Sequence, residues 1–183
     1  LLALETGILL YDQVGNGFES TLDMRGFSEG SGVRLFLDGA PLNDPRNNGL
    51  PLHVVPLDSL ERIEIRRGPA ASLAGSGAEA GIIHLITRRG GEFGGALRLD
   101  GGSDNAVGFS GELRDSIGFV DYFISAGRES TDGFRQNGGG DLRRLSGTVG
   151  LNLSSDRRLQ LSVLDSVSKL GNPGALTAEQ LAA

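Results

Sequence analysis

The sequence has no cysteine and no tryptophan, and it contains only 2 histidines among 183 residues. Without cysteine the chain has no disulfide framework, no thiolate metal site and no cysteine nucleophile. No apolar run reaches the roughly 18–20 residues that a membrane-spanning helix needs. Positive charge is also scarce, since 17 Lys and Arg stand against 23 Asp and Glu, for a net charge of −6. That balance argues against a nucleic-acid-binding protein, whose binding face is usually basic.

The amino-terminal end lacks the signals of a targeting segment. The chain begins with Leu1 rather than methionine, and neither a basic stretch nor a small-residue cleavage site follows. It therefore shows no signal peptide. From this start we expect the chain to be an excerpt from a longer protein, so the missing signals carry little information about its compartment.

Glycine is abundant, with 30 residues that follow no three-residue period. The missing period excludes collagen, and glycines between short apolar runs are typical of a chain rich in strands and turns. Residues 1–89 mix element types. Short strands are predicted at 7–13, 20–27, 32–39 and 62–66, and a fully buried strand is predicted at 81–89.

Irregular segments and short helices are expected between these strands. Four of the 6 prolines lie in residues 41–56, which are therefore predicted to form a long loop. Asp58 or Ser59 is expected to cap one helical turn with Glu61 in its first turn. Pro69 is expected to begin a second helical turn. Together these features predict an α+β fold with short strands and little helix.

From Gly90 onward the pattern changes to five successive runs in which apolar and polar residues alternate. Each run has roughly the 9–11 residues of a membrane-crossing strand. One face of the runs is predicted to carry the apolar residues Leu97, Leu99, Val107, Phe109, Leu113, Val120, Tyr122, Ile124, Ala126, Leu145, Val149, Leu151, Leu153, Leu159, Leu161 and Val163. The links between the runs alternate roughly between short and long, as in a meander whose two ends face different environments.

The same alternation also describes a soluble antiparallel sandwich, and by itself it favours neither interpretation. Two details favour a membrane barrel. Charge lies near almost every strand centre on the polar face, and the apolar face is free of it. Five strands with one face so polar do not close a compact soluble core, so they are interpreted as a segment of a larger barrel.

Motifs for phosphate binding and catalysis are absent or incomplete. The glycines in 75–81 are spaced GxGxxxG, and neither a long helix nor a GK[ST] signature follows. His53 and His84 lack a cysteine or carboxylate at ligand spacing, and neither Ser72 nor Ser76 lies in a GxSxG elbow. We therefore predict no enzyme activity, no catalytic residue, no cofactor and no metal site.

Two arginines end strand-like runs, and each precedes a glycine: Arg25 in "MRGF" and Arg67 in "RRGP". One interpretation is a solvated arginine at a strand end. The other is a guanidinium that binds carboxylates elsewhere in the molecule, because its rigid fork allows bidentate pairing. The residues alone leave both interpretations open.

A family resemblance connects these motifs. The ordered set "MRGF", "VRLFLDGAPLND" and "VPLDSLERIEIRRGPAASLAGSGAEAGIIHLITRR" resembles the plug domain of TonB-dependent outer-membrane receptors. The resemblance covers nearly all of residues 1–89, and the strands of 90–183 resemble the start of the barrel that follows. It implies an α+β plug with a mixed, four-stranded type of sheet and short helices. It also implies an antiparallel transmembrane β-barrel, of which this chain carries only the first strands and the plug lacks its N-terminal part.

The resemblance also assigns roles to residues. Arg25 and Arg67 match arginines that meet glutamates of the barrel wall in this family, and Glu61 and Glu64 are expected to share that network. The partners of the two arginines are expected beyond Ala183. Outward-facing loops of the plug are expected to supply the ligand contacts Ser28, Glu29, Arg46, Asn47 and Asn48. Structural turns are expected at Gly26, Gly39, Gly68, Pro69, Gly75, Gly77 and Gly81.

The function implied by the resemblance is import across the outer membrane of a Gram-negative bacterium. The ligand would be scarce, such as a ferric siderophore, cobalamin or haem, and movement of the plug would be driven by TonB through a segment that this chain lacks. Outer-membrane lipid is the other expected partner, and no nucleic acid is expected. Two alternatives stay open: a signalling or adhesive barrel without import, and a soluble β-rich binding domain. The sequence does not identify the ligand.

Overall fold

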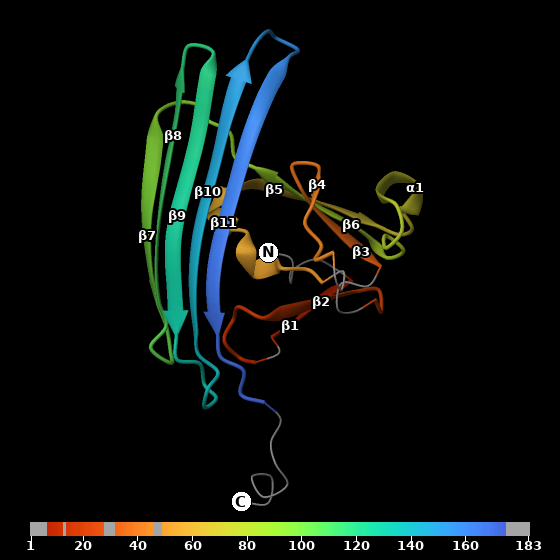
Figure 1. Ribbon diagram of the computed structural model, residues 1–183, viewed down its shortest axis with the longest axis vertical. Coiled ribbons are helices and arrows are strands. Elements are labelled where there is room, and N and C mark those ends of the chain that lie inside the picture. Colours follow the sequence, from red (N-terminus) through yellow and green to blue (C-terminus); the bar gives the residue numbers. More distant parts are fainter. Residues whose placement is uncertain (1–6, 13, 28–31, 46–48, 175–183) are drawn as a thin grey trace, which may run out of the picture.

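The structure of the chain is a computed structural model that describes residues 7–12, 14–27, 32–45 and 49–174. Figure 1 shows a tall sheet of long strands, and the elements of the first half of the chain lie against one of its faces. We call the described residues before Arg88 the plug and the long-stranded sheet the wall. The two parts differ in strand length, in sheet pairing and in the side of the strand that is buried.

The plug contains two sheets. The antiparallel pair β1 (Ile8–Asp12) and β2 (Ser20–Met24) forms one of them. The other has the order β4-β3-β6-β5 and is mixed, because β3 pairs parallel with β6 and the remaining pairs are antiparallel. Its strands are β3 (Val33–Leu37), β4 (Ala40–Pro41), β5 (Leu60–Arg67) and β6 (Gly81–Thr87). The predicted mixed four-stranded sheet is thus confirmed.

The apolar core of the plug lies between these two sheets. Leu22 and Met24 of β2 pack in one buried cluster with Val33 and Leu35 of β3 and with Ile83 of β6. Strand β6 was predicted to be fully buried, and this is wrong. Its residues alternate between buried and half-buried along the whole strand. The reason is that only one face of the sheet packs on the core, so a run of apolar residues does not make both faces interior.

The helical turns are shorter than predicted and shifted in position. The 3₁₀ helix η3 (Leu57–Ser59) contains Asp58 and Ser59 instead of being capped by them. Glu61 does not lie in that turn, because β5 already begins at Leu60. The helix α1 (Ala71–Ala74) begins two residues after Pro69.

The predicted loop at residues 41–56 is largely irregular. It contains the end of β4 and the 3₁₀ helix η2 (Leu52–Val54).

The wall is a sheet of five antiparallel strands in the order β11-β10-β9-β8-β7. The strands are β7 (Gly94–Gly101), β8 (Val107–Ile117), β9 (Val120–Thr131), β10 (Gly140–Asn152) and β11 (Arg158–Leu170). Each of them overlaps one of the five predicted runs. Within the described residues, β7 and β11 are the two edges, so these strands do not close on themselves.

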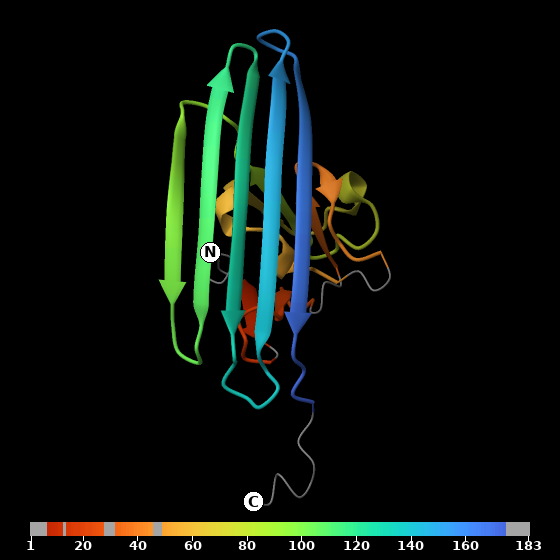
Figure 2. The ribbon, with the colours of Figure 1, turned by 60° about the vertical axis from the view of Figure 1, so that its left-hand side comes forward.

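The two faces of the wall have opposite character. The face away from the plug exposes apolar side chains, among them Leu99, Phe109, Leu113, Ile124 and Val163. Buried polar residues, among them Ser125, Ser146 and Thr148, occupy the face toward the plug. Figure 2 shows the outer face uncovered, with the plug behind it. The predicted separation of apolar and polar residues is confirmed for these positions. The prediction that the apolar face is free of charge is wrong, because Arg128, Asp141 and Arg143 lie on it.

The two ends of the wall differ in their connections. At the upper end in Figure 1, β8 and β9 are joined by Gly118–Phe119, and the connection from the plug enters β7. At the lower end the longest connection, Asp132–Gly139, joins β9 to β10. No helix among the described residues has the length and hydropathy to cross a membrane.

Candidate functional site: the interface between plug and wall

The RGF and RGP motifs, which are far apart in the sequence, meet in the plug. Arg25 ends β2 in a left-handed conformation, with φ of 58°, and its side chain is exposed. A Cβ built on Gly68 would lie 3.6 Å from the Arg25 Nη1 atom, so the guanidinium reaches the second motif. Arg67 is exposed at the end of β5. The structure therefore places the Arg25 side chain next to the RGP motif that contains Arg67.

The two glutamates of the predicted lock bind a neighbour on their own strand. Arg62 donates to Glu64 Oε1 at 2.8 Å and to Glu61 Oε1 at 3.1 Å. The hydrogen bond from Arg62 lowers the pKa of Glu64 below its usual range. His84 Nδ1 lies 3.9 Å from Glu64 Oε2. A role of Glu61 and Glu64 in locking Arg25 and Arg67 stays a prediction.

The predicted ligand contacts Ser28, Glu29, Arg46, Asn47 and Asn48 lie outside the described residues. The predicted turn glycines are described, and their conformations are left-handed: φ is 84° at Gly26, 89° at Gly39, 106° at Gly68, 75° at Gly75 and 88° at Gly77. Gly81 serves a close approach, because a Cβ there would lie 2.3 Å from the carbonyl oxygen of Arg66. Pro69 is exposed directly after Gly68.

Asp38 forms the first polar connection between plug and wall. It occupies the turn after β3 with φ of 48°, a conformation that aspartate tolerates better than most residues. Its carboxylate accepts hydrogen bonds from Thr87 N at 2.9 Å and from Thr87 Oγ1 at 2.6 Å. The same group accepts from Gln160 Nε2 at 3.2 Å and Ser162 Oγ at 3.3 Å on β11. One side chain therefore joins two plug strands to the wall.

The connection from plug to wall is held at two points. Arg88 Nη1 donates to Glu112 Oε1 on β8 at 3.0 Å, and Arg88 Nε donates to the Leu60 carbonyl at 3.1 Å. Gly90 N donates to Asp121 Oδ1 at 3.1 Å. Only glycine fits at this position, since a Cβ on Gly90 would lie 2.3 Å from the Asp115 carbonyl oxygen.

Asp121 belongs to a buried charge cluster on the wall. Arg158 contacts both carboxylate oxygens of Asp121, with Nη2 at 2.9 Å from Oδ1, and Asn152 Nδ2 donates to Oδ2 at 2.8 Å. A bidentate guanidinium and an amide leave this carboxylate well satisfied despite its burial. The cluster holds in place the Asp121 carboxylate, which accepts the hydrogen bond from Gly90 N.

The short helices of the plug make further polar contacts with the wall. Asp58 Oδ2 accepts from Ser110 Oγ at 2.8 Å, and Arg98 Nη1 lies 3.8 Å from Asp58 Oδ1. Arg144 Nη1 donates to the His53 carbonyl at 3.2 Å. Burial lowers the pKa of the His53 imidazole, because the neutral form is favoured away from water.

A cavity of about 530 Å³ opens between the plug and the lower part of the wall. Residues 15–18 of the plug and the connection between β7 and β8 line it, and Asp58, Arg98, Glu129 and Arg144 bring charges of both signs. Its volume is within the range of small-molecule pockets. Its lining offers donors and acceptors suited to a polar ligand. The described residues contain no group of three or more His, Cys, Asp or Glu that could hold a metal ion.

A comparison with known families matches this architecture. The sequence model of the "TonB-dependent Receptor Plug Domain" matches residues 1–82, which end in β6 of the mixed sheet. The chain belongs to the TonB-dependent receptor family. It is therefore a protein of the outer membrane of a Gram-negative bacterium.

Curated TonB-dependent receptors align over most of the chain. A "Vitamin B12 transporter BtuB" of Vibrio vulnificus is 31% identical over 131 residues, which cover 70% of this chain and 21% of that protein. The "Ferric enterobactin receptor" of Pseudomonas aeruginosa is 28% identical over 165 residues, covering 73% of this chain and 22% of that receptor. The chain thus spans about a fifth of the length of these relatives.

Solved receptor structures share the fold. The FrpB iron transporter of Neisseria meningitidis superposes with a TM-score of 0.73 at 19% identity, over 98% of this chain and 30% of that one. The siderophore receptor PirA of Acinetobacter baumannii gives 0.68 at 19% identity, over 87% of this chain and 27% of that one. Both comparisons place plug and wall strands together in one architecture.

Sequence reasoning on this TonB-dependent receptor missed the wall half of the interface. It placed charge on the polar face of the strands but did not identify Glu112, Asp121, Arg144 or Arg158 as contacts of the plug connection. The available signal was charge at strand centres, which is costly unless the charges are paired or solvated. Asp38 was interpreted as a turn residue in Asp-Gly, and its second role as a connection to β11 required the tertiary structure.

Proposed function

We propose that the whole protein is a transporter that imports a scarce small ligand across the outer membrane, with residues 1–89 as the gate and 90–183 as the first part of the barrel. Family membership supports this proposal, since relatives are named as vitamin B12, ferric enterobactin and ferrioxamine B receptors. TonB, acting through a segment outside this chain, is the proposed energy-coupling partner. The ligand class proposed is a ferric siderophore, cobalamin or a similar polar molecule.

The observation that supports a gate is the polar nature of the interface. Asp38, Asp58 and Gly90 contact the wall through hydrogen bonds. The interface also contains apolar residues: Leu164 packs against the buried apolar cluster of the plug, and Phe123 and Leu142 are buried on the plug-facing side of the wall. Net contributions of single hydrogen bonds are about 0.5–1.5 kcal/mol, because water replaces the partners when they separate. Water can therefore replace the hydrogen-bonded contacts at a modest cost for each of them.

The contacts also divide the plug into two parts. Among the described residues, Asp38, His53, Asp58, Arg88 and Gly90 form hydrogen bonds that join the part of the plug with the mixed sheet to the wall. The β1–β2 pair is a separate sheet, and the loop between its strands meets the wall where Phe18 lies against Gly140 and Gly15 lies against Phe134. We propose that the β1–β2 pair separates from the wall more readily than the mixed sheet does.

Uptake by the full-length receptor tests the function. The receptor would be expressed in a Gram-negative host that lacks its own receptors, with and without TonB, and supplied with radiolabelled ferric enterobactin, ferrioxamine B or cyanocobalamin. We expect accumulation of at least one ligand, and we expect it to require both TonB and the receptor's segment before Leu1.

Three outcomes would count against the proposal. Uptake that continues without TonB, or that survives deletion of the preceding segment, would contradict energy coupling by TonB. Binding of a ligand with no accumulation at all would contradict import itself. The last outcome would support the signalling alternative. A pair of cysteines at Asp58 and Ser110, in a chain that otherwise has none, would then show by disulfide formation whether plug and wall meet as described.

A further inference from the structure

The outer face of the wall carries a group of cations that its apolar surroundings do not explain. We call Arg128, Arg143 and Lys169, together with the carboxylate Asp141, the basic patch. Arg128 lies on β9, Arg143 and Asp141 lie on β10, and Lys169 lies on β11. The cross-strand pairs Arg128–Arg143 and Asp141–Lys169 place all four on one face.

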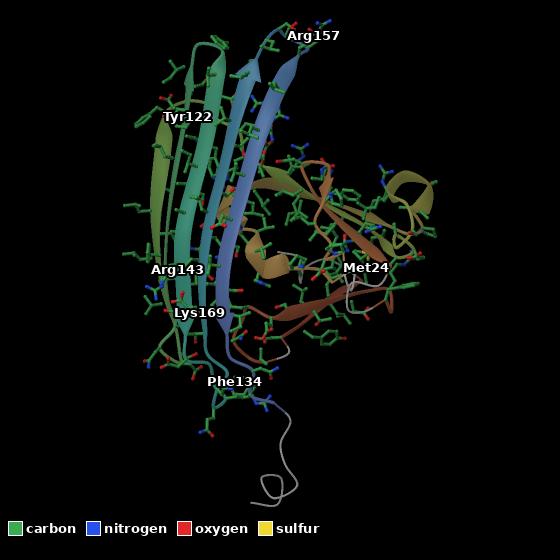
Figure 3. The ribbon with its side chains drawn as sticks, in the orientation of Figure 1. Met24, Tyr122, Phe134, Arg143, Arg157 and Lys169 are labelled. Atoms are coloured by element: carbon green, nitrogen blue, oxygen red, sulfur yellow. The ribbon has the colours of Figure 1, made fainter. Side chains whose placement is uncertain are left out.

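That face points away from the plug. Arg128 is paired across the strands with Phe109 on β8, and Arg143 is paired with Val167 on β11. The side chains of Phe109 and Val167 are both more than half exposed. Figure 3 shows Arg143 and Lys169 in the lower part of the wall, below Tyr122. The basic patch therefore lies where the apolar outer face approaches the lower end of the strands.

The charges within the basic patch do not balance. Arg128 Nε donates to Asp141 Oδ2 at 2.8 Å, and Arg143 Nε lies 3.4 Å from Asp141 Oδ1, so two guanidiniums share one carboxylate. Asp165 is the nearest further carboxylate along this face, two residues before Val167 on β11. Three cations thus meet two carboxylates, although the whole chain carries a net charge of −6.

The arrangement of the two arginines is costly without a further anion. Like charges directly opposite on neighbouring strands destabilise a sheet. Arginine side chains flanked by apolar residues extend their stems along the apolar surface and place the charged end at the boundary with water. At an outer-membrane surface that boundary is the layer of lipid headgroups, and anionic headgroups attract basic clusters.

We propose that the basic patch binds the phosphate of a lipid headgroup in the outer leaflet, a phosphorylated glycolipid of the lipid A type. The leaflet follows from the connections. Outer-membrane barrels have short turns on the periplasmic side and longer loops outside, and the basic patch lies at the end that carries Asp132–Gly139. The proposal rests on the outer-membrane location and not on import, so it stands or falls separately from the proposed function.

The experiment compares lipid binding by variants of the full-length receptor, delipidated in non-ionic detergent. The probe is bis-phosphorylated lipid A, titrated and followed by native mass spectrometry, with dephosphorylated lipid A and inorganic phosphate as the other arms. The test variant is Arg128→Gln/Arg143→Gln. The matched control is Arg157→Gln, an exposed arginine in the turn at the opposite end of the wall (Figure 3).

We expect the double variant to bind bis-phosphorylated lipid A about 30-fold more weakly, since each basic residue near an anionic surface contributes roughly five-fold. Arg157→Gln should bind as the parent does, and Arg128→Lys/Arg143→Lys should retain most of the affinity because both charges remain. Folding is checked by the electrophoretic mobility of unboiled samples.

Three results would overturn the proposal: equal binding by the parent and the folded double variant, an equal loss in Arg157→Gln, or equal binding of dephosphorylated lipid A. Binding of inorganic phosphate as tight as that of the lipid would also overturn it, because the site would then recognise a free anion.

Discussion

Leucine has opposite surroundings in the plug and in the wall. Leu35 on β3 is fully buried, whereas Leu97 on β7 is 89% exposed. Polar residues show the reverse, since Thr148 on β10 is fully buried while Arg66 on β5 is exposed. The plug follows the rule for a protein in water, and the wall follows the rule for a sheet with lipid on its outer side. One chain thus contains plug strands suited to water and wall strands suited to lipid on one face.

The largest effect is expected where the plug behaves as a water-soluble core. Leu35→Ala should destabilise the plug by about 2–5 kcal/mol, because it removes a buried side chain and leaves a cavity. Limited proteolysis of the folded receptor in urea would measure the loss. The control is Leu57→Ala, at an exposed plug position, which should change stability by less than about 0.5 kcal/mol. Equal sensitivity of both variants would contradict the assigned core.

The second prediction tests the lipid-facing side of the wall. Ile124 lies in the middle of β9 on the outer face, and Ile124→Arg should cost about 2–4 kcal/mol in a bilayer, where a cation is poorly solvated. Unfolding of the full-length receptor in phospholipid vesicles measures this cost. Leu57→Arg is the matched control in the plug, where exposure to water makes the change small. A negligible cost at Ile124 would favour the soluble sandwich instead.

A third prediction concerns the connection between the two regions. Asp38→Ala should weaken the attachment by about 1–3 kcal/mol, because the buried Thr87 loses acceptors for its amide and hydroxyl. Hydrogen exchange of the Thr87 amide in the intact receptor reports the effect. Asp38→Asn should be intermediate, since asparagine tolerates the left-handed turn but replaces one acceptor by a donor. Unchanged exchange in Asp38→Ala would remove Asp38 from the interface.

The smallest effect is a pH dependence at His53. Burial lowers the pKa of His53 from 6.5, so the folded state binds fewer protons than the unfolded state. Its contribution to stability is therefore complete above about pH 6.5 and declines as the pH falls from there through the lowered pKa. Hydrogen exchange around η2 across this range would show the decline. His53→Gln should remove it, and persistence of the same decline in that variant would assign it to another group.

Strand positions were predictable to a large extent, because alternation records which residues share a face. The five wall strands and the first three plug strands lie within or close to their predicted ranges. Burial was less predictable. The run at β6 contains apolar residues on both faces, yet His84 and its neighbours on one face are only half-buried. Periodicity identifies the faces but not what covers each of them.

The candidate site was predictable only in part. The RGF and RGP motifs indicated Arg25 and Arg67, and the structure brings the two motifs together. The partners of Arg88 and Gly90 on the wall are separated from them by 24 and 31 positions in sequence. No local pattern joins residues that meet only after a sheet has packed on another sheet.

The sequence alone determined the strands, the turns and the separation of apolar from polar faces, because these depend on the two-residue period of a strand and on local glycine and aspartate conformations. The tertiary structure decided which face lies inside. In the wall the plug covers the polar face, so Asp121 and Thr148 are buried and Arg158 is half-buried, while the leucines point outward. A residue's environment depends on what packs against its strand, and that depends on contacts between distant parts of the chain.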